Sequence, residues 1–161
     1  MTSDATVSED TTLQEIDAQA PVVGACEIQV AADPEAAWAV LTQIERWPSW
    51  NPAVKSVSVE GGLEEGSKFR WKAGPGTIKS TIRDLDAPWR ISWTGTSLGL
   101  KAIHVHTFER HDNGTIVRTE ESYDGLVARL FRGRLQRMLD GALKSELRHL
   151  KAEAERPERS T

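Results

Sequence analysis

The sequence predicts an α+β domain in which a curved antiparallel sheet of about seven strands packs against one long C-terminal helix. Three observations predict it. A first strand over residues 23–30 is followed by two short helices, and six strand-like segments then follow one another between turn residues. The last segment, from residue 126 to about 155, has helical periodicity and no proline. Strands that follow one another, without alternating helices, are typical of α+β folds.

The two short helices come directly after the first strand. Asp33 followed by Pro34 predicts a helix start, because Asp can accept hydrogen bonds from free amides and Pro is tolerated in a first turn. The helix is expected to continue through residues 35–41. A second helical turn is expected over residues 44–47.

Period-two alternation marks the strands of the middle of the chain. Glycine, proline and asparagine separate them, in the pairs and triplets that form turns. The expected strands are residues 54–60, 67–73, 77–85, 89–96, 101–110 and 115–123.

The predicted C-terminal helix is amphipathic, so we expect it to lie on the sheet. At steps of 100° its apolar positions gather on one broad side: Phe131, Leu135, Met138, Leu139, Ala142, Leu143, Leu147, Leu150 and Ala154. Arg137, Lys144, Arg148 and Lys151 lie opposite. Glu146 falls among the apolar positions. Either it lies at the edge of the apolar side and reaches water, or its carboxylate points into a partly wet cavity.

The Asn113-Gly114 pair predicts a two-residue hairpin turn that pairs Asp112 with Thr115. Counting outward from this turn gives the pairs His106–Glu121, Phe108–Thr119 and His104–Tyr123 on one face of the sheet. Glu109 and Arg118 meet on the other face as a cross-strand ion pair. Hydrophobicity leaves open which face points inward, because Ile103 and Val105 lie opposite the histidines.

Charge and composition limit the function classes. The net charge of −4 argues against nucleic acid as a partner. No apolar run reaches the ~20 residues of a transmembrane helix, so no membrane insertion is expected. Cys26 is the one cysteine and cannot form an intramolecular disulfide. No signal peptide is recognisable, so we expect a cytoplasmic protein.

The chain is expected to divide into three parts. Residues 1–22 carry five acidic residues and no Lys or Arg, which predicts a flexible acidic tail. Residues 23–155 form the folded domain. Residues 156–161 are expected to be a frayed C-terminus.

Six tryptophans in 161 residues is a high number, and some of them alternate with other apolar residues. Trp71 alternates with Phe69, and Trp93 alternates with Ile91 and Trp89, which places such residues on one face of a sheet. Core packing explains each one singly. Together, large flat side chains with a few polar groups are also what a pocket for an apolar ligand requires.

Several segments resemble one family. Residues 44–54 contain Trp47-Pro48-Ser49-Trp50-Asn51-Pro52, which is similar to the Trp-Pro-x-Trp-Asn-Pro signature of polyketide cyclase/dehydrase-like proteins of the START-like (SRPBCC, helix-grip) superfamily. Residues 114–125 resemble the last strand of that family, where it leads into the long helix. Residues 27–38 resemble its first strand and helix. The resemblance covers about residues 23–154.

The resemblance implies a cavity between the sheet and the long helix, with the face that carries Phe108 and Thr119 turned inward. The protein is then expected to bind a hydrophobic small molecule that is polyketide-like, cyclic or lipid-like. The expected ligand-binding residues are Phe69, Trp71, Ile91, Trp93, His104, His106, Phe108, Thr119, Glu121, Tyr123, Met138, Ala142 and Glu146. The two tryptophans of the signature are expected to pack the short helices onto the sheet.

The alternative is an enzyme, a polyketide cyclase/dehydratase of the aromatase type. His106 and Glu121 are the candidate catalytic residues, because an imidazole beside a carboxylate can act as a general base. His104 and His106 are spaced as half of a metal site that Glu121 would complete, but zinc sites more often use clearer Cys or His clusters. We therefore expect no metal and no cofactor.

Overall fold

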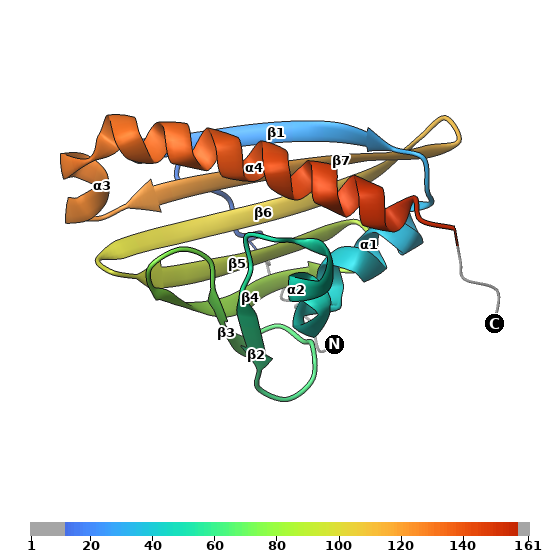
Figure 1. The fold of residues 1–161 in the computed structure, drawn as a ribbon, viewed down its shortest axis with the longest axis horizontal. Coiled ribbons are helices and arrows are strands. Elements are labelled where there is room, and N and C mark those ends of the chain that lie inside the picture. The colour runs from blue at the N-terminus through green and yellow to red at the C-terminus, as the bar shows by residue number, and fades with distance from the viewer. Residues whose placement is uncertain (1–11, 158–161) are drawn as a thin grey trace, which may run out of the picture.

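The computed structural model of the protein describes residues 12–157. Its regular structure begins with a strand and ends with a long helix (Figure 1). The strands are β1 (Val22–Val30), β2 (Ser56–Val59), β3 (Lys68–Lys72), β4 (Thr77–Asp86), β5 (Arg90–Ser97), β6 (Leu100–His111) and β7 (Gly114–Asp124). The helices are α1 (Pro34–Thr42), the 3-10 turn η1 (Ile44–Arg46), α2 (Trp47–Trp50), α3 (Leu126–Leu130) and α4 (Arg132–Ala154).

All seven strands belong to one antiparallel sheet in the order β1-β7-β6-β5-β4-β3-β2. The predicted fold class is therefore confirmed. Strands β2 to β7 each pair with the next strand in the chain, and β1 pairs with β7 at one edge of the sheet. Strand bounds agree with the expected ones to within two residues at each end. Asp33 does stand before α1, but its side chain makes no capping hydrogen bond.

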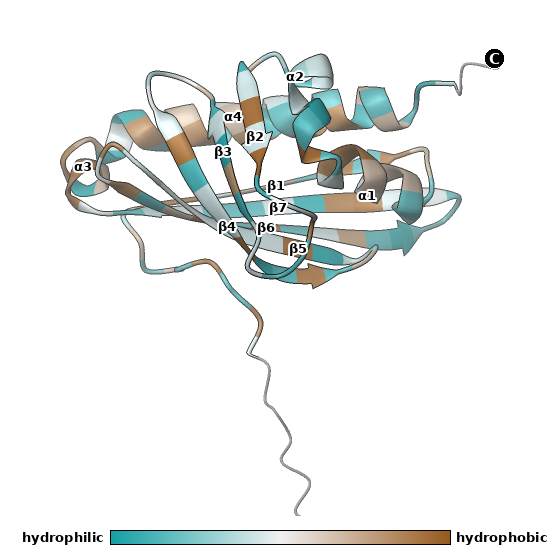
Figure 2. Ribbon diagram, turned by 90° about the horizontal axis from the view of Figure 1, so that it is seen from below, coloured by the Kyte–Doolittle hydropathy of each residue, from teal (hydrophilic) through white to brown (hydrophobic). Residues whose placement is uncertain are grey.

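Helices α1, α2 and α4 cover one face of the sheet, as Figure 2 shows. We call this the inner face. Every second residue of the strands points to it, and these residues form the main core with α1, α2 and the C-terminal half of α4. Trp47 and Trp50 are both buried in that core, as the sequence led us to expect. Leu139 and Leu143 pack with Val22 in a second, smaller core.

Residues 12–21 lie on the opposite, outer face (Figure 2). The amide of Gln14 donates to Oδ2 of Asp84 at 2.8 Å, and the amide of Asp17 donates to Oγ of Ser122 at 3.1 Å. Arg90 donates to the carbonyl of Gln14. We expected a flexible tail through residue 22. The structure differs from that expectation over residues 12–21, because their amides find acceptors on the sheet; residues 1–11 lie outside the described residues.

The β6–β7 hairpin corrects the predicted register. His111 pairs with Gly114, so the two turn residues are Asp112 and Asn113, one position earlier than expected. Asp112 takes the positive φ of 51°. Gly114 is the first residue of β7, and only glycine fits there, because a Cβ would collide with the backbone of Val30. The pairing between β6 and β7 shifts by two residues. Each residue of β6 therefore has a different partner on β7, while its side chain stays on the predicted face of the sheet.

All the predicted cross-strand pairs are wrong as a result. On the inner face His104 lies opposite Glu121, His106 opposite Thr119 and Phe108 opposite Val117. On the outer face Arg118 lies opposite Thr107, and its guanidinium pairs with Glu120 and Glu27 in place of Glu109.

The predicted C-terminal helix is interrupted at Phe131, where the backbone leaves helical geometry between α3 and α4. The buried side of α4 is narrower than expected and consists of five leucines: Leu135, Leu139, Leu143, Leu147 and Leu150. Phe131 and Met138 are each 54% exposed, and Ala142 is also exposed. Among the described residues, no helix is long and apolar enough to cross a membrane.

Candidate functional site

The inner face of the central strands gathers most of the expected ligand-binding residues. Phe69, Ile91, Trp93, His104, His106, Phe108 and Thr119 are all buried there. Trp71, Glu121, Tyr123 and Glu146 are half-buried. Met138 and Ala142 differ, because α4 turns both toward solvent. The site is therefore built from β3, β5, β6 and β7, with Glu146 contributed by α4.

An aromatic cluster forms one part of the site. Trp47 of α2 packs edge-to-face on Trp71 and Phe69, with ring centroids 5.3 and 5.6 Å apart. Phe69 in turn packs edge-to-face on Trp93 at 5.9 Å. Trp71 donates its Nε1 proton to Oγ of Ser80 at 3.1 Å. Sequence reasoning gave Trp47 only a packing role, although the Trp-Pro motif placed it beside the sheet.

A polar cluster lies beside these rings. We call it the His/Glu cluster; its members are His104, His106, Thr119, Glu121 and Glu146. Nε2 of His106 lies 2.7 Å from Oε1 of Glu146, and Nε2 of His104 lies 2.6 Å from Oγ1 of Thr119. His104 also lies 3.5 Å from Glu121 and 3.8 Å from Glu146.

The carboxylate beside His106 is thus Glu146 of α4, and the expected partner Glu121 lies beside His104. The signal for Glu146 was present in the sequence, since it is the one acidic residue among the apolar positions of the helix. Of its two interpretations, the structure supports the inward one: the Glu146 side chain is 15% exposed and hydrogen-bonds to His106.

Burial and neighbouring charges separate the pKa values of the cluster. Burial, with the charge of His106, lowers the pKa of His104 to about 3. Burial, with the charge of Glu146, raises the pKa of Glu121 well above its usual range. Burial would raise the pKa of Glu146, but His106 and His104 outweigh it and lower that pKa. At neutral pH His104 is therefore neutral. The two carboxyl groups are shifted in opposite directions: burial favours the protonated form of Glu121, and the imidazoles favour the ionised form of Glu146.

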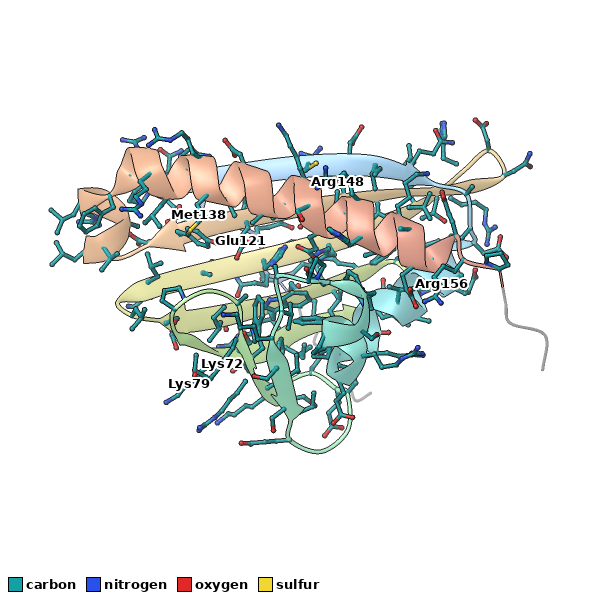
Figure 3. The ribbon with its side chains drawn as sticks, in the orientation of Figure 1. Lys72, Lys79, Glu121, Met138, Arg148 and Arg156 are labelled. Carbon is teal, nitrogen blue, oxygen red and sulfur yellow. The ribbon has the colours of Figure 1, made fainter. Side chains whose placement is uncertain are left out.

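The cluster reaches solvent on its carboxylate side. The side chains of Glu121 and Glu146 are 14% and 15% exposed, whereas His106 has no exposed surface. Figure 3 shows Glu121 on β7 near α4, whereas Met138 is 54% exposed on α4. A small molecule approaching from this side meets the carboxylates first and the imidazoles behind them.

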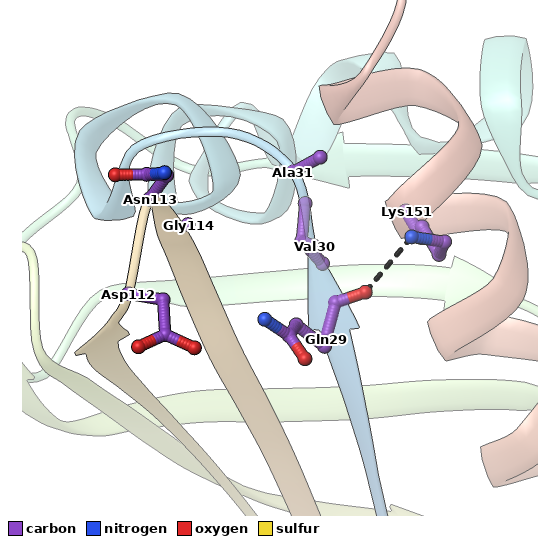
Figure 4. Close-up of a pocket in the computed structure, with 7 residues that line it drawn as sticks. All are labelled: Gln29, Val30, Ala31, Asp112, Asn113, Gly114 and Lys151. Atoms are coloured by element: carbon purple, nitrogen blue, oxygen red, sulfur yellow. Dashed lines mark hydrogen bonds between the residues drawn. The ribbon is translucent and has the colours of Figure 1, made fainter.

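Two surface hollows lie away from the His/Glu cluster. The first, of about 420 Å³, lies where the β6–β7 turn meets the end of β1 and Lys151 of α4 (Figure 4). Lys151 donates there to the carbonyl of Gln29 at 2.9 Å. The second, of about 400 Å³, lies between Asp17 and Arg132. Neither hollow is lined by a residue of the His/Glu cluster, and neither contains a buried pair of acid and base side chains.

Within residues 12–157, His104, His106 and Glu146 form a group that could hold a metal ion. One ligand atom from each lies within 4.8 Å of the others. Two imidazoles and one carboxylate are a ligand set that first-row divalent metals accept. In the sequence, the spacing of the two histidines indicated half of a metal site, with Glu121 considered as its completion and no metal expected. The structure places Glu146 beside the two histidines instead.

Comparison with known proteins gives the family. Residues 25–155 match the family described as polyketide cyclase / dehydrase and lipid transport. The chain belongs to this family. It is therefore a polyketide cyclase-like member of the START-like (SRPBCC) superfamily, as its sequence motifs suggested. No curated protein sequence matches the chain significantly.

Solved structures similar to this member of the family share its fold at low identity. The hypothetical protein jhp0584 from Helicobacter pylori is 15% identical with a TM-score of 0.77, over 89% of this chain and 98% of that one. The di-domain ARO/CYC protein StfQ of the steffimycin biosynthetic pathway is 20% identical with a TM-score of 0.72; the match covers 83% of this chain and 50% of StfQ. A START superfamily protein from Mycobacterium smegmatis is 16% identical with a TM-score of 0.61, over 80% and 98%.

Proposed function

We propose that this protein binds a hydrophobic small molecule, polyketide-like, cyclic or lipid-like, between the inner face of its sheet and α4. The family supports this proposal, because its description joins polyketide cyclases with lipid transport. The single observation that carries it is the His/Glu cluster beside the aromatic cluster. Four ionisable side chains on an otherwise apolar face are costly to bury, and the core of the fold does not need them.

The two clusters suggest how a ligand is held. Trp71, which is half-buried, offers an apolar ring to a ligand, and the buried Trp93 lies behind it in the aromatic cluster. Glu121 and Glu146 offer oxygen atoms at the accessible edge. A ligand with an apolar ring and a hydroxyl or carbonyl at one end would match both parts.

Native mass spectrometry of the protein purified from its own host tests the proposal directly. We expect a co-purified small molecule that is released when the protein is denatured. Titration with an apolar fluorescent probe gives a second test with matched variants. Trp71→Leu, in the aromatic cluster, should weaken probe binding by at least about tenfold. Trp89→Leu is the matched control, because Trp89 is 42% exposed, and this change should leave probe binding unaltered.

An equal effect of the two tryptophan substitutions would contradict a ligand site on the inner face. So would a protein that carries no small molecule and binds no apolar probe.

A cyclase/dehydratase is the second candidate, and the hydrogen bond between His106 and Glu146 favours it. Aldol cyclisation requires a base beside a carbonyl, and an imidazole held by a carboxylate can supply it. Glu146→Gln should then abolish conversion of a polyketone while probe binding persists. A carrier would return its ligand unchanged in both proteins.

A further inference from the structure

The first inference concerns a metal ion. The ligand atoms of the His/Glu cluster have the spacing of a three-residue metal site. Nε2 of His106 lies 2.7 Å from Glu146, and Nε2 of His104 lies 3.8 Å from it. Ligands that hold zinc at 2.0–2.2 Å lie about 3.3 Å from one another in a tetrahedron. Small side-chain rotations would bring all three atoms to that separation.

The surrounding residues hold the two imidazoles in place. His104 and His106 alternate on β6, so both point to the inner face, and their ring centroids are 4.3 Å apart. Trp93 stacks on the ring of His106 at 5.1 Å. Because these rings are already fixed, a metal ion would not have to order them.

A second carboxylate lies where a metal-bound histidine commonly has one. Oε2 of Glu121 is 3.5 Å from Nδ1 of His104, the nitrogen on the other side of the ring from Glu146. Carboxylates in this position orient a histidine ligand and increase its basicity. Among the residues that the structure describes, neither Glu121 nor Glu146 pairs with Lys or Arg. Two carboxylates and two imidazoles therefore suit the charge of a divalent cation.

We infer that His104, His106 and Glu146 bind a divalent first-row metal ion such as Zn²⁺, with Glu121 positioning His104. Mixed nitrogen and oxygen ligands fit Zn²⁺, Co²⁺ or Fe²⁺ better than Mg²⁺ or Ca²⁺, which prefer oxygen alone. This inference goes beyond the proposed function, because metal binding can be measured without knowing the organic ligand.

The test is equilibrium dialysis of the full chain against Zn²⁺, followed by elemental analysis, with Co²⁺ absorption spectra as a second readout on the unaltered protein. We expect one ion per chain and the visible bands of four- or five-coordinate Co²⁺. His104→Ala with His106→Ala should abolish both. Glu121→Gln should weaken binding by about 10–100-fold. His111→Ala is the matched control, because its side chain is 49% exposed and lies outside the cluster.

Substoichiometric Zn²⁺ and octahedral Co²⁺ spectra in the unaltered protein would overturn the inference, whatever the folding of the variants. Unchanged binding in the double variant, with its fold checked by circular dichroism, would overturn it too. Loss of apolar probe binding with retained metal would contradict the proposed function alone.

A second inference rests on a different part of the molecule. Large apolar side chains protrude at the end of the domain where α3 joins α4. Leu126 is 69% exposed, Leu130 68% and Phe131 54%. Leu98 in the β5–β6 turn is 67% exposed and lies at the same end, since a Cβ on the adjacent Gly99 would be 3.1 Å from Val127 of α3. We call these four residues the α3 apolar patch.

Positive charge lies beside the patch. Residues 125–139 contain Arg129, Arg132, Arg134 and Arg137 and no acidic residue, in a chain whose net charge is −4, although Arg129 pairs with the adjacent Asp124 at 3.7 Å. All four arginines are exposed. Nucleic acid would bind the arginines but would leave the exposed leucines in water. An anionic lipid surface attracts Arg and also takes up apolar side chains between its headgroups.

The geometry points to the α3 apolar patch as a docking surface for an anionic lipid bilayer. Docking of this kind lays the end of the domain on the membrane and needs no spanning helix. Flotation with phosphatidylglycerol vesicles should recover the full chain, and phosphatidylcholine vesicles should not. Leu126→Asn with Leu130→Asn, and separately Arg132→Gln with Arg134→Gln, should each weaken binding at least about tenfold.

Leu63→Asn is the matched control, because this exposed leucine lies in the β2–β3 loop. Absence of flotation, or equal flotation of the leucine variant, would overturn the docking surface. Self-association of the chain that the leucine variant abolishes, without vesicle binding, would overturn it as well and identify the patch as a contact between copies.

Discussion

Gly141 lies in the middle of α4, and a Cβ placed on it would meet nothing within 4 Å. Glycine in a helix interior is less favourable than alanine by about 0.5–1 kcal/mol, because its unfolded backbone is more mobile. Gly141→Ala should therefore increase the free energy of unfolding by that amount. Urea denaturation measures it, and a decrease would mean that this face of α4 is covered.

Gly24 is the opposite case. It lies in β1 under α4, where a Cβ would be 3.0 Å from Leu143 and 3.1 Å from Leu139. Gly24→Val should push α4 away from β1 and cost about 1–3 kcal/mol of unfolding free energy. Gly62→Val serves as a control with open space around it. Equal denaturation midpoints for these two variants would contradict the close approach of β1 and α4.

Single residues explain why the site could be predicted only in part. The alternation of His104, His106 and Phe108 placed them correctly on one face, since strand period depends only on local geometry. Their partners depend on the turn, which the Asn113-Gly114 pair predicted one position too late. Gly114 lies in β7 against the backbone of Val30, a contact that the sequence near the hairpin does not reveal. The predicted pairs were therefore shifted by two residues.

The leucines of α4 form the wall of the core opposite the sheet. Leu143 and Leu147 are each 1% exposed and lie one turn apart. Replacing either with Ala should lower the free energy of unfolding by roughly 2–5 kcal/mol.

Lys144→Ala and Arg148→Ala are the controls for this helix, because both side chains are exposed and Arg148 points away from the sheet (Figure 3). They should change the free energy of unfolding by no more than about 0.5 kcal/mol. Similar losses in both sets would mean that α4 is rotated about its axis.

The order and type of the helices and strands could be predicted from the sequence, but the break between α3 and α4 could not. The seven strands appear where alternation predicted them. The break at Phe131 was missed because Phe131 and Leu135 keep a helical spacing of four residues across it. Phe131, which periodicity placed on the buried side of the helix, is therefore exposed and belongs to the α3 apolar patch.

For the whole molecule, the N-terminal segment decides which groups of the outer face are buried. Val105, Ser92 and Ser122 point outward from the sheet, yet they are at most 2% exposed. The sequence showed Val105 opposite the histidines and left the inner face undecided. The structure explains this ambiguity. Helices α1, α2 and α4 cover the inner face, and residues 12–21 cross part of the outer face, where they contact Asp84 and Ser122 (Figure 2).

A truncated chain that lacks residues 1–19 should be less stable than a chain that lacks only residues 1–11. The longer deletion removes the hydrogen bonds of Gln14 and Asp17 to Asp84 and Ser122 and leaves Arg90 without its contacts to Gln14 and Glu15. At about 1 kcal/mol for each hydrogen bond, the loss should be about 2–3 kcal/mol, which lowers the melting temperature by several degrees. Differential scanning calorimetry of the two chains measures the difference. Identical melting temperatures would show that residues 12–19 lie on the sheet without stabilising it. In that case, amide hydrogen exchange at Val105 would be equally slow in the chain that lacks residues 1–19 and in the chain that lacks residues 1–11.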